Sequence, residues 1–474
     1  MSEFALEIDQ DKFLRPDKTE VHAVLSLTGS GAGRPAAGAG APDFAEVILI
    51  DCSSSMEYPS SKIAAALSAT RAAIDALADG ALFAVVKGTG SAEMVHPRHT
   101  GLVRADAGTR RQALRALTHV QSGGSTAIGR WLDLARELHR THDRPIRHAT
   151  LLTDGQKTDH QHTFEQTLER CRGAFQCDAR GIGDDWNSRE VLHIAEALRG
   201  RGDAVREEHE LADDFRAIIA AAMGRRLAQL RIRLTLSGFA EFRYLKQVFP
   251  IEADLSAHVH RVDERTIEID TGAWGDESRD YQLCLTVGTA GEPNENVRAA
   301  RIDLVAGDDP LVTPGLILLH RISDPFGSEQ LSSRFEHYRE QLELSQAVGD
   351  GCDLYQVGNH AAALTAWQRA VDLAQASGNQ EILHRLRQVV EADPGTGRLR
   401  LRPGVRRRDL LWLDTGSVVL ERSRQAPAGP AVVPGPRQPV VAGPDQVCPC
   451  GRISPWAANF CEHCKQPLKR VGTA

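Results

Sequence analysis

The sequence contains no apolar run that approaches the roughly 18 residues a helix needs to cross a lipid bilayer. Its first residues, MSEFALEIDQDKF, also lack the basic stretch followed by an apolar stretch that marks a secretory signal. The net charge of −7 over 474 residues is modest, so it implies no strong attraction to nucleic acid or to an anionic membrane. We therefore expect a globular, cytoplasmic protein that does not bind membranes.

The cysteines do not have the even number and regular spacing of a disulfide framework. There are nine, of which five are scattered through the chain and four lie within the last 27 residues. Scattered thiols with one compact cluster fit a reducing compartment and a single metal site.

The motifs of common catalytic sites are missing as well. The stretch GSGAGRPAAGAG is not followed by Lys and Ser or Thr and does not lead into an obvious helix, so it is not a phosphate-binding loop. No Ser/His/Asp or Cys/His set stands at a recognisable spacing. His160 and His162 indicate a polar loop rather than a metal site. We expect a protein that is not an enzyme.

Hydrophobic periodicity divides the first two thirds of the chain into three segments. Residues 1–43 hold alternating strands and a Gly-rich loop, and residues 44–222 alternate short apolar strands with amphipathic helices. The second pattern predicts an α/β fold with a doubly wound, mainly parallel sheet. Residues 223–325 have a period of two and predict an antiparallel β-sandwich. We expect the N-terminal strands to complete this sandwich, so that the α/β domain is inserted in it.

The last third of the chain changes character several times. Residues 326–394 are helical, and GNHAAALTAWQRAVDLAQASGN resembles one tetratricopeptide-type helix pair. Because a solenoid needs about three repeats, we predict a helical hairpin packed on the sandwich. Residues 395–425 alternate Arg with apolar residues and indicate short strands, and residues 426–445 form a Pro-rich linker. A compact module follows over residues 446–474.

Oxygen-bearing side chains follow two predicted strands of the α/β segment. The strand EVILID ends in Asp51, and the next loop supplies Ser53 and Ser55. Thr126 starts a helix in GGSTAIG, and Asp154 ends another strand in LLTDG. Ligands of doubly wound sheets bind outside the carboxyl ends of the strands, so we expect these side chains to meet there. Five hard oxygen donors predict a site for Mg²⁺ or Mn²⁺; the alternative is helix capping without a metal.

These motifs, together with GIGDDWN, resemble those of the von Willebrand factor A (VWA) family over the whole α/β segment. The resemblance implies a metal-ion-dependent adhesion site (MIDAS). In it the hydroxyls of Ser53, Ser55 and Thr126 contact the metal, while Asp51 and Asp154 often act through water. An ion held in this way has room for one more anionic oxygen, such as a partner's Asp or Glu.

Three further features concern the α/β segment and its surroundings. FPIEADLSAHV and TGAWGDESRDYQL resemble the C-terminal region of a bacterial subgroup of the family, which joins the VWA domain to a sandwich and helices. Asp184 and Asp185 follow another predicted strand, and we expect them to cap the next helix or turn rather than to border the metal crevice. Cys52 is a soft ligand that suits Mg²⁺ poorly, so we expect it to fill space.

The C-terminal module is marked by the sequence CPCGRISPWAANFCEHC. Cys448, Cys450, Cys461 and Cys464 form two pairs that suit tetrahedral Zn²⁺. A module this short cannot bury a useful core, so the metal would supply its folding energy. It resembles a zinc ribbon but begins with C-x-C, which leaves His463 open as a substitute ligand and a redox pair or disulfides as alternatives. Zinc ribbons bind both proteins and nucleic acids.

These observations predict a Mg²⁺-dependent protein-interaction scaffold whose partner presents an acidic side chain. Association by family suggests bacterial stress or phosphorylation signalling. One alternative is an accessory subunit that recruits a separate AAA-type ATPase, and another is a nucleic-acid adaptor that works through the ribbon. The run Arg406, Arg407 and Arg408 indicates a solvated or acid-paired face, because it lacks interleaved aromatic residues. The sequence leaves the oligomeric state open.

Overall fold

The computed structural model divides the chain into two units, Met1–Pro427 and Ala428–Ala474. In the described part of the chain, no helix is long and apolar enough to cross a membrane. The structure describes residues 3–15, 18–30, 43–288, 296–307, 309–321, 332–393, 398–423, 446–447 and 453–454.

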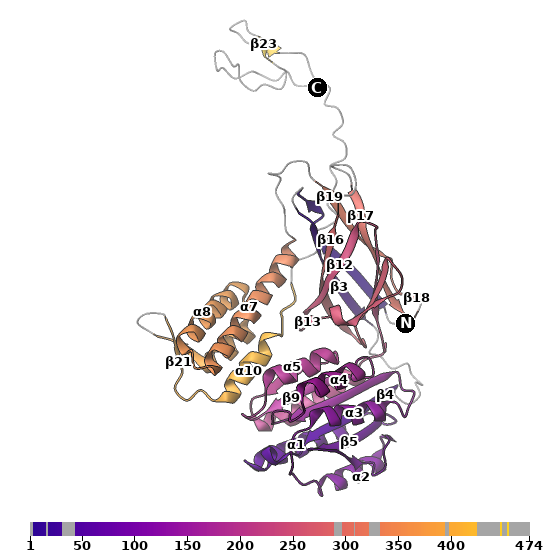
Figure 1. Cartoon of the computed structure of the whole chain (residues 1–474), viewed down its shortest axis with the longest axis vertical. Coiled ribbons are helices and arrows are strands. Elements are labelled where there is room, and N and C mark those ends of the chain that lie inside the picture. Colours follow the sequence, from indigo (N-terminus) through magenta and orange to yellow (C-terminus); the bar gives the residue numbers. More distant parts are fainter. Residues whose placement is uncertain are drawn as a thin grey trace, which may run out of the picture. The chain divides into compact units, whose positions relative to one another are not determined.

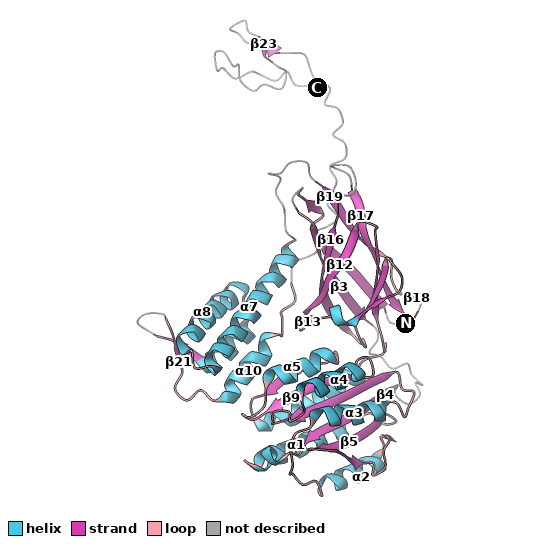
Figure 2. Ribbon diagram, in the orientation of Figure 1, coloured by secondary structure: helices cyan, strands magenta, loops and turns pink. Residues whose placement is uncertain are grey.

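A mainly parallel sheet forms the centre of the α/β domain (Figures 1 and 2). Its strand order is β10-β9-β8-β4-β5-β6, and β7 also pairs with β5. Strands β6 and β7 pair antiparallel with β5, and the other pairs are parallel. This confirms the predicted doubly wound sheet. The strands are β4 (Phe44–Asp51), β5 (Leu82–Gly88), β6 (Ala92–His96), β7 (Val103–Arg104), β8 (Ile146–Thr153), β9 (Gln176–Ile182) and β10 (Gly202–Val205).

Helices cover both faces of this sheet. Side chains of β4 alternate between two cores: Ile48 packs with Phe215 of α6 on one face, and Val47 packs with Trp131 of α3 on the other. All eight residues of β4 are buried, as expected of a strand covered on both faces. The first face carries α1 (Ser61–Ala76), α2 (Ala107–Leu117) and α6 (Leu211–Met223), and the second carries α3 (Ile128–His139), α4 (Gln161–Cys171) and α5 (Ser188–Ala197).

Two antiparallel sheets form the sandwich, and the α/β domain is inserted in it. Strand β3 (Glu20–Ser30), which precedes the α/β domain, pairs with β16 (Glu277–Val287), which follows it. Their sheet has the order β1-β3-β16-β12-β13, and the other has the order β14-β15-β11-β17-β19-β2 with β18 beside β17. The remaining strands are β1 (Glu3–Gln10), β2 (Phe13–Leu14), β11 (Arg231–Leu236), β12 (Ala240–Phe249), β13 (Ala253–Asp254), β14 (Val259–Arg261), β15 (Thr266–Asp270), β17 (Asn296–Ala306), β18 (Asp309–Pro310) and β19 (Gly315–Arg321).

The helical segment begins with the hairpin of α7 (Ser333–Gln356) and α8 (His360–Ser377), and α9 (Gln380–Val389) follows. The stretch that resembled a helix pair forms the single helix α8. Asn359 caps its start by accepting a hydrogen bond from the Ala362 N–H. The N-terminus of α7 packs on the sandwich, where the Ser332 hydroxyl donates to Asp9 Oδ2 at 2.6 Å.

Residues 395–425, for which we predicted short strands, differ from that expectation. The short strand β21 (Leu399–Leu401) pairs with β20 (Val390–Ala392), but the main element is helix α10 (Arg407–Ser417). Leu411 packs in a core of the α/β domain, whereas Leu410 and Leu413 pack among the C-terminal helices. A helix that is buried on two sides lacks the single apolar stripe that marks a helix in a sequence.

In the C-terminal unit, the described residues form two short strands. Strands β22 (Gln446–Val447) and β23 (Ile453–Ser454) pair antiparallel. The predicted zinc ligands Cys448, Cys450, Cys461 and Cys464 lie outside the described residues, as does His463.

Candidate metal centre

The candidate metal centre lies at the carboxyl ends of the neighbouring strands β4 and β8. Asp51 is the last residue of β4, and Asp154 directly follows β8. The Asp51 carboxylate accepts hydrogen bonds from the Ser53 N–H at 2.8 Å and from the Thr153 hydroxyl at 2.7 Å. These bonds turn the chain sharply after β4 and bring Ser53 and Ser55 over the end of the sheet.

The structure brings all five predicted ligand residues together. Ser53 Oγ lies 2.9 Å from Ser55 Oγ, and the Ser55 hydroxyl donates to Asp154 Oδ1 at 2.6 Å. The Asp154 N–H donates to Asp51 Oδ2 at 3.4 Å. Thr126 reaches the cluster from the loop before α3: a Cβ placed on the glycine after Asp154 would lie 3.2 Å from both Ser55 Oγ and Thr126 Oγ1.

This donor set fits a hard divalent cation. Two oxygens on adjacent corners of a Mg²⁺ octahedron, with bonds near 2.0–2.1 Å, lie about 2.9 Å apart. The 2.9 Å between Ser53 Oγ and Ser55 Oγ matches this value, and the 2.6 Å between Ser55 Oγ and Asp154 Oδ1 is shorter because the two atoms share a hydrogen bond. Asp51, Asp154, Ser53 and Thr126 are buried, whereas Ser55 is half-buried, so the cluster is accessible at Ser55.

Burial raises the pKa of Asp51 above its ordinary value, although hydrogen bonds from Ser53 and Thr153 act in the opposite direction. The ionised carboxylate is therefore costly in this position without a cation nearby. Such a group stabilises a bound metal ion and is stabilised by it.

Sequence reasoning missed Lys62, which contributes a positive charge to the site. Its Nζ lies 2.9 Å from Asp154 Oδ2, and the residue is 4% exposed. Burial by itself lowers the pKa of Lys62, but the hydrogen bond and charge of Asp154 outweigh burial and hold that pKa above its ordinary value. The sequence feature that could have identified Lys62 is its place in the first turn of the helix that follows the D-x-S-x-S loop.

The structure corrects the expectation for Asp184 and Asp185. Asn187, rather than either aspartate, caps the next helix α5 by accepting from the Arg189 N–H at 3.0 Å. Asp185 Oδ2 instead lies 3.4 Å from Lys62 Nζ, and therefore borders the metal crevice. Asp184 Oδ1 accepts from the backbone N–H of Arg408 in α10 at 2.8 Å.

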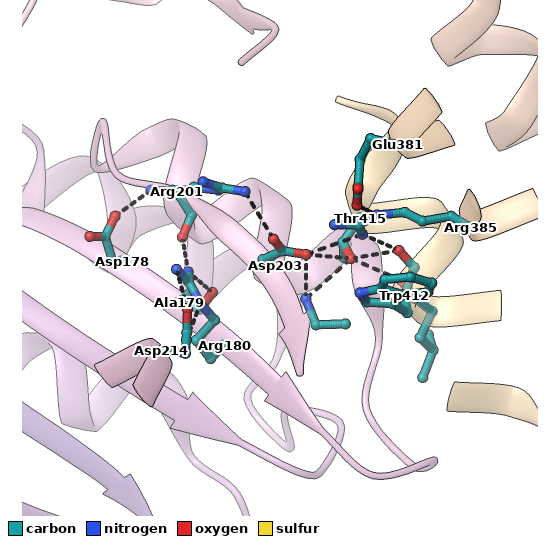
Figure 3. A network of polar contacts seen from close by, with 12 residues as sticks. Asp178, Ala179, Arg180, Arg201, Asp203, Asp214, Glu381, Arg385, Trp412 and Thr415 are labelled. Atoms are coloured by element: carbon teal, nitrogen blue, oxygen red, sulfur yellow. Dashed lines mark hydrogen bonds and ion pairs between the residues drawn. The ribbon is translucent and has the colours of Figure 1, made fainter. Parts of the chain in front are cut away.

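Polar contacts join helix α10 to β10 at the edge of the sheet (Figure 3). The Asp203 carboxylate of β10 accepts a hydrogen bond from the Thr415 hydroxyl at 3.2 Å and lies 3.5 Å from Arg385 Nη1. The Arg385 guanidinium also donates to the Trp412 carbonyl and stacks over its ring at 4.4 Å from the centroid. Through these contacts α9 and α10 cover the β10 edge of the α/β domain.

The arginine run at the start of α10 is mostly paired with acids, as expected. Arg406 Nη2 lies 3.4 Å from Glu207 Oε1, and Arg408 Nη2 lies 3.5 Å from Asp184 Oδ2. Cys52 is fully buried, and burial raises its pKa to about 12. Its thiol therefore stays protonated, which fits a space-filling role.

One other grouping of side chains that could hold a metal ion lies in the sandwich. Glu20, His22 and Cys284 place one ligand atom each within 4.8 Å of one another, and theirs is the one such group found among the described residues. An ion pair between Arg243 and Glu20 supplies positive charge there. His160 and His162, which we predicted in a polar loop, lie at the start of a helix instead: His160 directly precedes α4, and His162 is in its first turn, where it bonds to Gln166 at 3.1 Å. Among the described residues, neither histidine belongs to such a group.

The fold and site define a doubly wound α/β domain with an oxygen-ligand centre at the end of its sheet. The family description "von Willebrand factor type A domain" matches residues 46–203. A second, "von Willebrand factor type A C-terminal domain", matches residues 372–417, which include α9 and α10. The solved structure of a von Willebrand factor type A protein from Catenulispora acidiphila is 38% identical, with a TM-score of 0.81, and the match covers 89% of this chain and 97% of that one. The chain belongs to the von Willebrand factor type A family.

A more distant structure shares the fold. The ArnB paralog VWA2 from Sulfolobus acidocaldarius is 14% identical, with a TM-score of 0.55, and the match covers 88% of this chain and 98% of that one. None of the curated proteins compared with the chain matches it. VWA domains commonly mediate metal-dependent protein interactions and are generally not catalytic.

Proposed function

We propose that this chain is an intracellular scaffold that holds an acidic side chain of a partner protein through a divalent cation, Mg²⁺ or Mn²⁺. The observation that carries the proposal is the oxygen cluster at the end of the sheet, in which Ser53 and Ser55 have the spacing of neighbouring metal ligands and the Asp154 carboxylate lies beside them. A bound ion would supply a Lewis-acidic centre with a coordination position left for the partner's carboxylate.

The chain's own residues account for the rest of the proposed clasp. Ser53, Ser55 and Thr126 offer neutral oxygens, so the ion would keep positive charge for the partner. Asp51 is buried beneath them and orients the loop through its bond to the Ser53 N–H. The Ser55 hydroxyl donates to Asp154, but the same carboxylate is paired with the Lys62 ammonium at 2.9 Å, which makes it a weak base. We therefore propose binding without turnover.

The cellular setting is a further part of the proposal. Cys52, Cys171, Cys177, Cys284 and Cys352 are free thiols, which supports a reducing compartment such as the cytoplasm. By likeness to bacterial proteins that combine a VWA domain with a zinc ribbon, we propose a role in stress or phosphorylation signalling.

The test of the proposed function is affinity capture from a lysate of the source cells in Mg²⁺ or in EDTA. Partner proteins should bind in Mg²⁺ and be lost in EDTA, and Thr126→Ala should lose them in both buffers because it removes one hydroxyl ligand. Ser125→Ala is the matched control, since this exposed neighbour should retain capture. Partners that bind equally well in EDTA would show that no metal clasp is involved.

The C-terminal cysteines give a second prediction. Four thiolates in two pairs can hold one Zn²⁺ tetrahedrally, and the Pro-rich segment separates them from the rest of the chain. We expect one zinc per chain, lost in the double variant Cys461→Ser with Cys464→Ser, while the melting temperature of the remainder barely changes. Elemental analysis of protein purified under reducing conditions measures this.

The control for the zinc prediction is Cys284→Ser, which disrupts the Glu20, His22 and Cys284 group of the sandwich and should leave the zinc content unchanged. Zinc that disappears in this control, or protein purified without zinc, contradicts the assignment to the C-terminal module.

A further inference from the structure

The positively charged ammonium of Lys62 is paired with Asp154, one of the residues proposed to hold the metal. Its ammonium donates to Asp154 Oδ2 at 2.9 Å and to the Ser55 carbonyl at 3.4 Å. Both partners belong to the candidate metal centre. The Lys62 side chain is 5% exposed, so water screens its charge poorly.

The chain is shaped to hold this lysine. Gly183 adopts a φ of +80°, and a Cβ at that position would lie 3.0 Å from Lys62 Cε. A side chain there would crowd the lysine arm as well as strain the backbone. The backbone at Gly183 therefore packs directly against the Lys62 side chain.

A second acidic partner for the ammonium stands beside the first. Asp185 Oδ2 lies 3.4 Å from Lys62 Nζ, and its side chain is 68% exposed. The neighbouring Asp184 is anchored on α10 by its bond to the Arg408 N–H. Asp185 is thus held at the rim of the centre, where it can take over the charge of Lys62 without a large movement.

We propose that Lys62 is the internal cation of the metal centre, which neutralises Asp154 before a metal binds and shifts onto Asp185 when one does. This inference rests on the proposed metal site. An ammonium so close to a divalent ion repels it, so Lys62 weakens metal binding and Asp185 relieves the repulsion. Together they tune the affinity of the site for its metal.

Isothermal titration of the full chain with Mg²⁺ alone tests this inference. Lys62→Met should tighten the Mg²⁺ Kd at least about tenfold, and Asp185→Asn should weaken it by about tenfold. Because Asp185 acts through Lys62, adding Asp185→Asn to Lys62→Met should change Kd by less than about twofold. Two independent long-range charges would instead give additive effects, which would contradict the inference.

Lys157→Met is the matched control. Lys157 follows Asp154 by three residues but pairs with Glu190 at 3.0 Å, so its removal should change the Mg²⁺ Kd by less than about twofold. Asp185 is exposed, so its variant tests the inference even if Lys62→Met fails to fold.

The outcomes separate this inference from the proposed function. If wild type and Lys62→Met bind Mg²⁺ with the same Kd, the role of Lys62 is overturned and the metal site stands. Binding of Mg²⁺ by neither protein overturns both.

Discussion

Replacing His148 with glutamine is expected to lower the free energy of unfolding by about 3–5 kcal/mol, the range for breaking a buried ion pair from one side. His148 lies in β8, fully buried, with Nδ1 at 2.7 Å from Glu46 Oε2 and Nε2 at 3.2 Å from Asp178 Oδ2. Its imidazolium thus links two acids on the strands either side. Without it, Glu46 loses the positive charge that is hydrogen-bonded to it, and Asp178 loses one cationic neighbour but keeps Arg225 and Arg180.

Urea denaturation measures this loss, and the chain supplies a matched control. His193 also pairs with a carboxylate, Glu165, at 3.0 Å, but its side chain is 41% exposed. His193→Gln should cost less than about 1 kcal/mol, as is usual for surface ion pairs. Equal effects of the two substitutions would show that His148 is not charged in the folded protein.

The same residue predicts how stability depends on pH. Burial lowers the pKa of His148, but Glu46 and Asp178 outweigh burial and raise it from 6.5 to about 9. A pKa that is higher in the folded than in the unfolded chain gives stability that is complete below pH 6.5. It is lost as the pH rises through about 9. The free energy of unfolding of wild type, measured by urea denaturation, should therefore fall between pH 6.5 and about 9. In His148→Gln it should depend less on pH over the same range.

The sequence alone predicts the α/β domain well because its signals are local. The stretch EVILID is mostly apolar, which indicates a central parallel strand, and all its residues are buried in the structure. The aspartate at its end indicates a ligand site. The insertion in the sandwich could also be predicted, because strands with a period of two stand on both sides of the α/β pattern.

Features that depend on distant contacts could not be predicted. Helix α10 packs between two cores, so its apolar residues do not form the stripe expected of a helix. The position of Asp184 before a helix predicts a local cap, but its carboxylate accepts a hydrogen bond from Arg408, 224 positions away. The sequence around Lys62 predicts an ordinary helix residue, because its contact with Asp154 forms only when distant segments fold together.

Removing two hydroxyl ligands is expected to have the largest effect on binding. Ser53→Ala with Thr126→Ala leaves the buried Asp51 in place but takes away two neutral oxygens of the cluster. Loss of an outer-shell group alone typically costs 10–100-fold in metal affinity, so we expect a loss of at least about 100-fold here. The melting temperature of the metal-free protein should change little, because both hydroxyls face the crevice rather than a core.

The most direct test of the central claim counts Mn²⁺ bound to the full chain, by the decrease in the electron paramagnetic resonance signal of the free ion. The metal-centre account predicts one tight Mn²⁺ per chain in wild type and in Ser125→Ala, and none at the same concentrations in the double variant. A wild type that binds no Mn²⁺, or a double variant that binds it as tightly, would contradict a metal centre built from Asp51, Ser53, Ser55, Thr126 and Asp154.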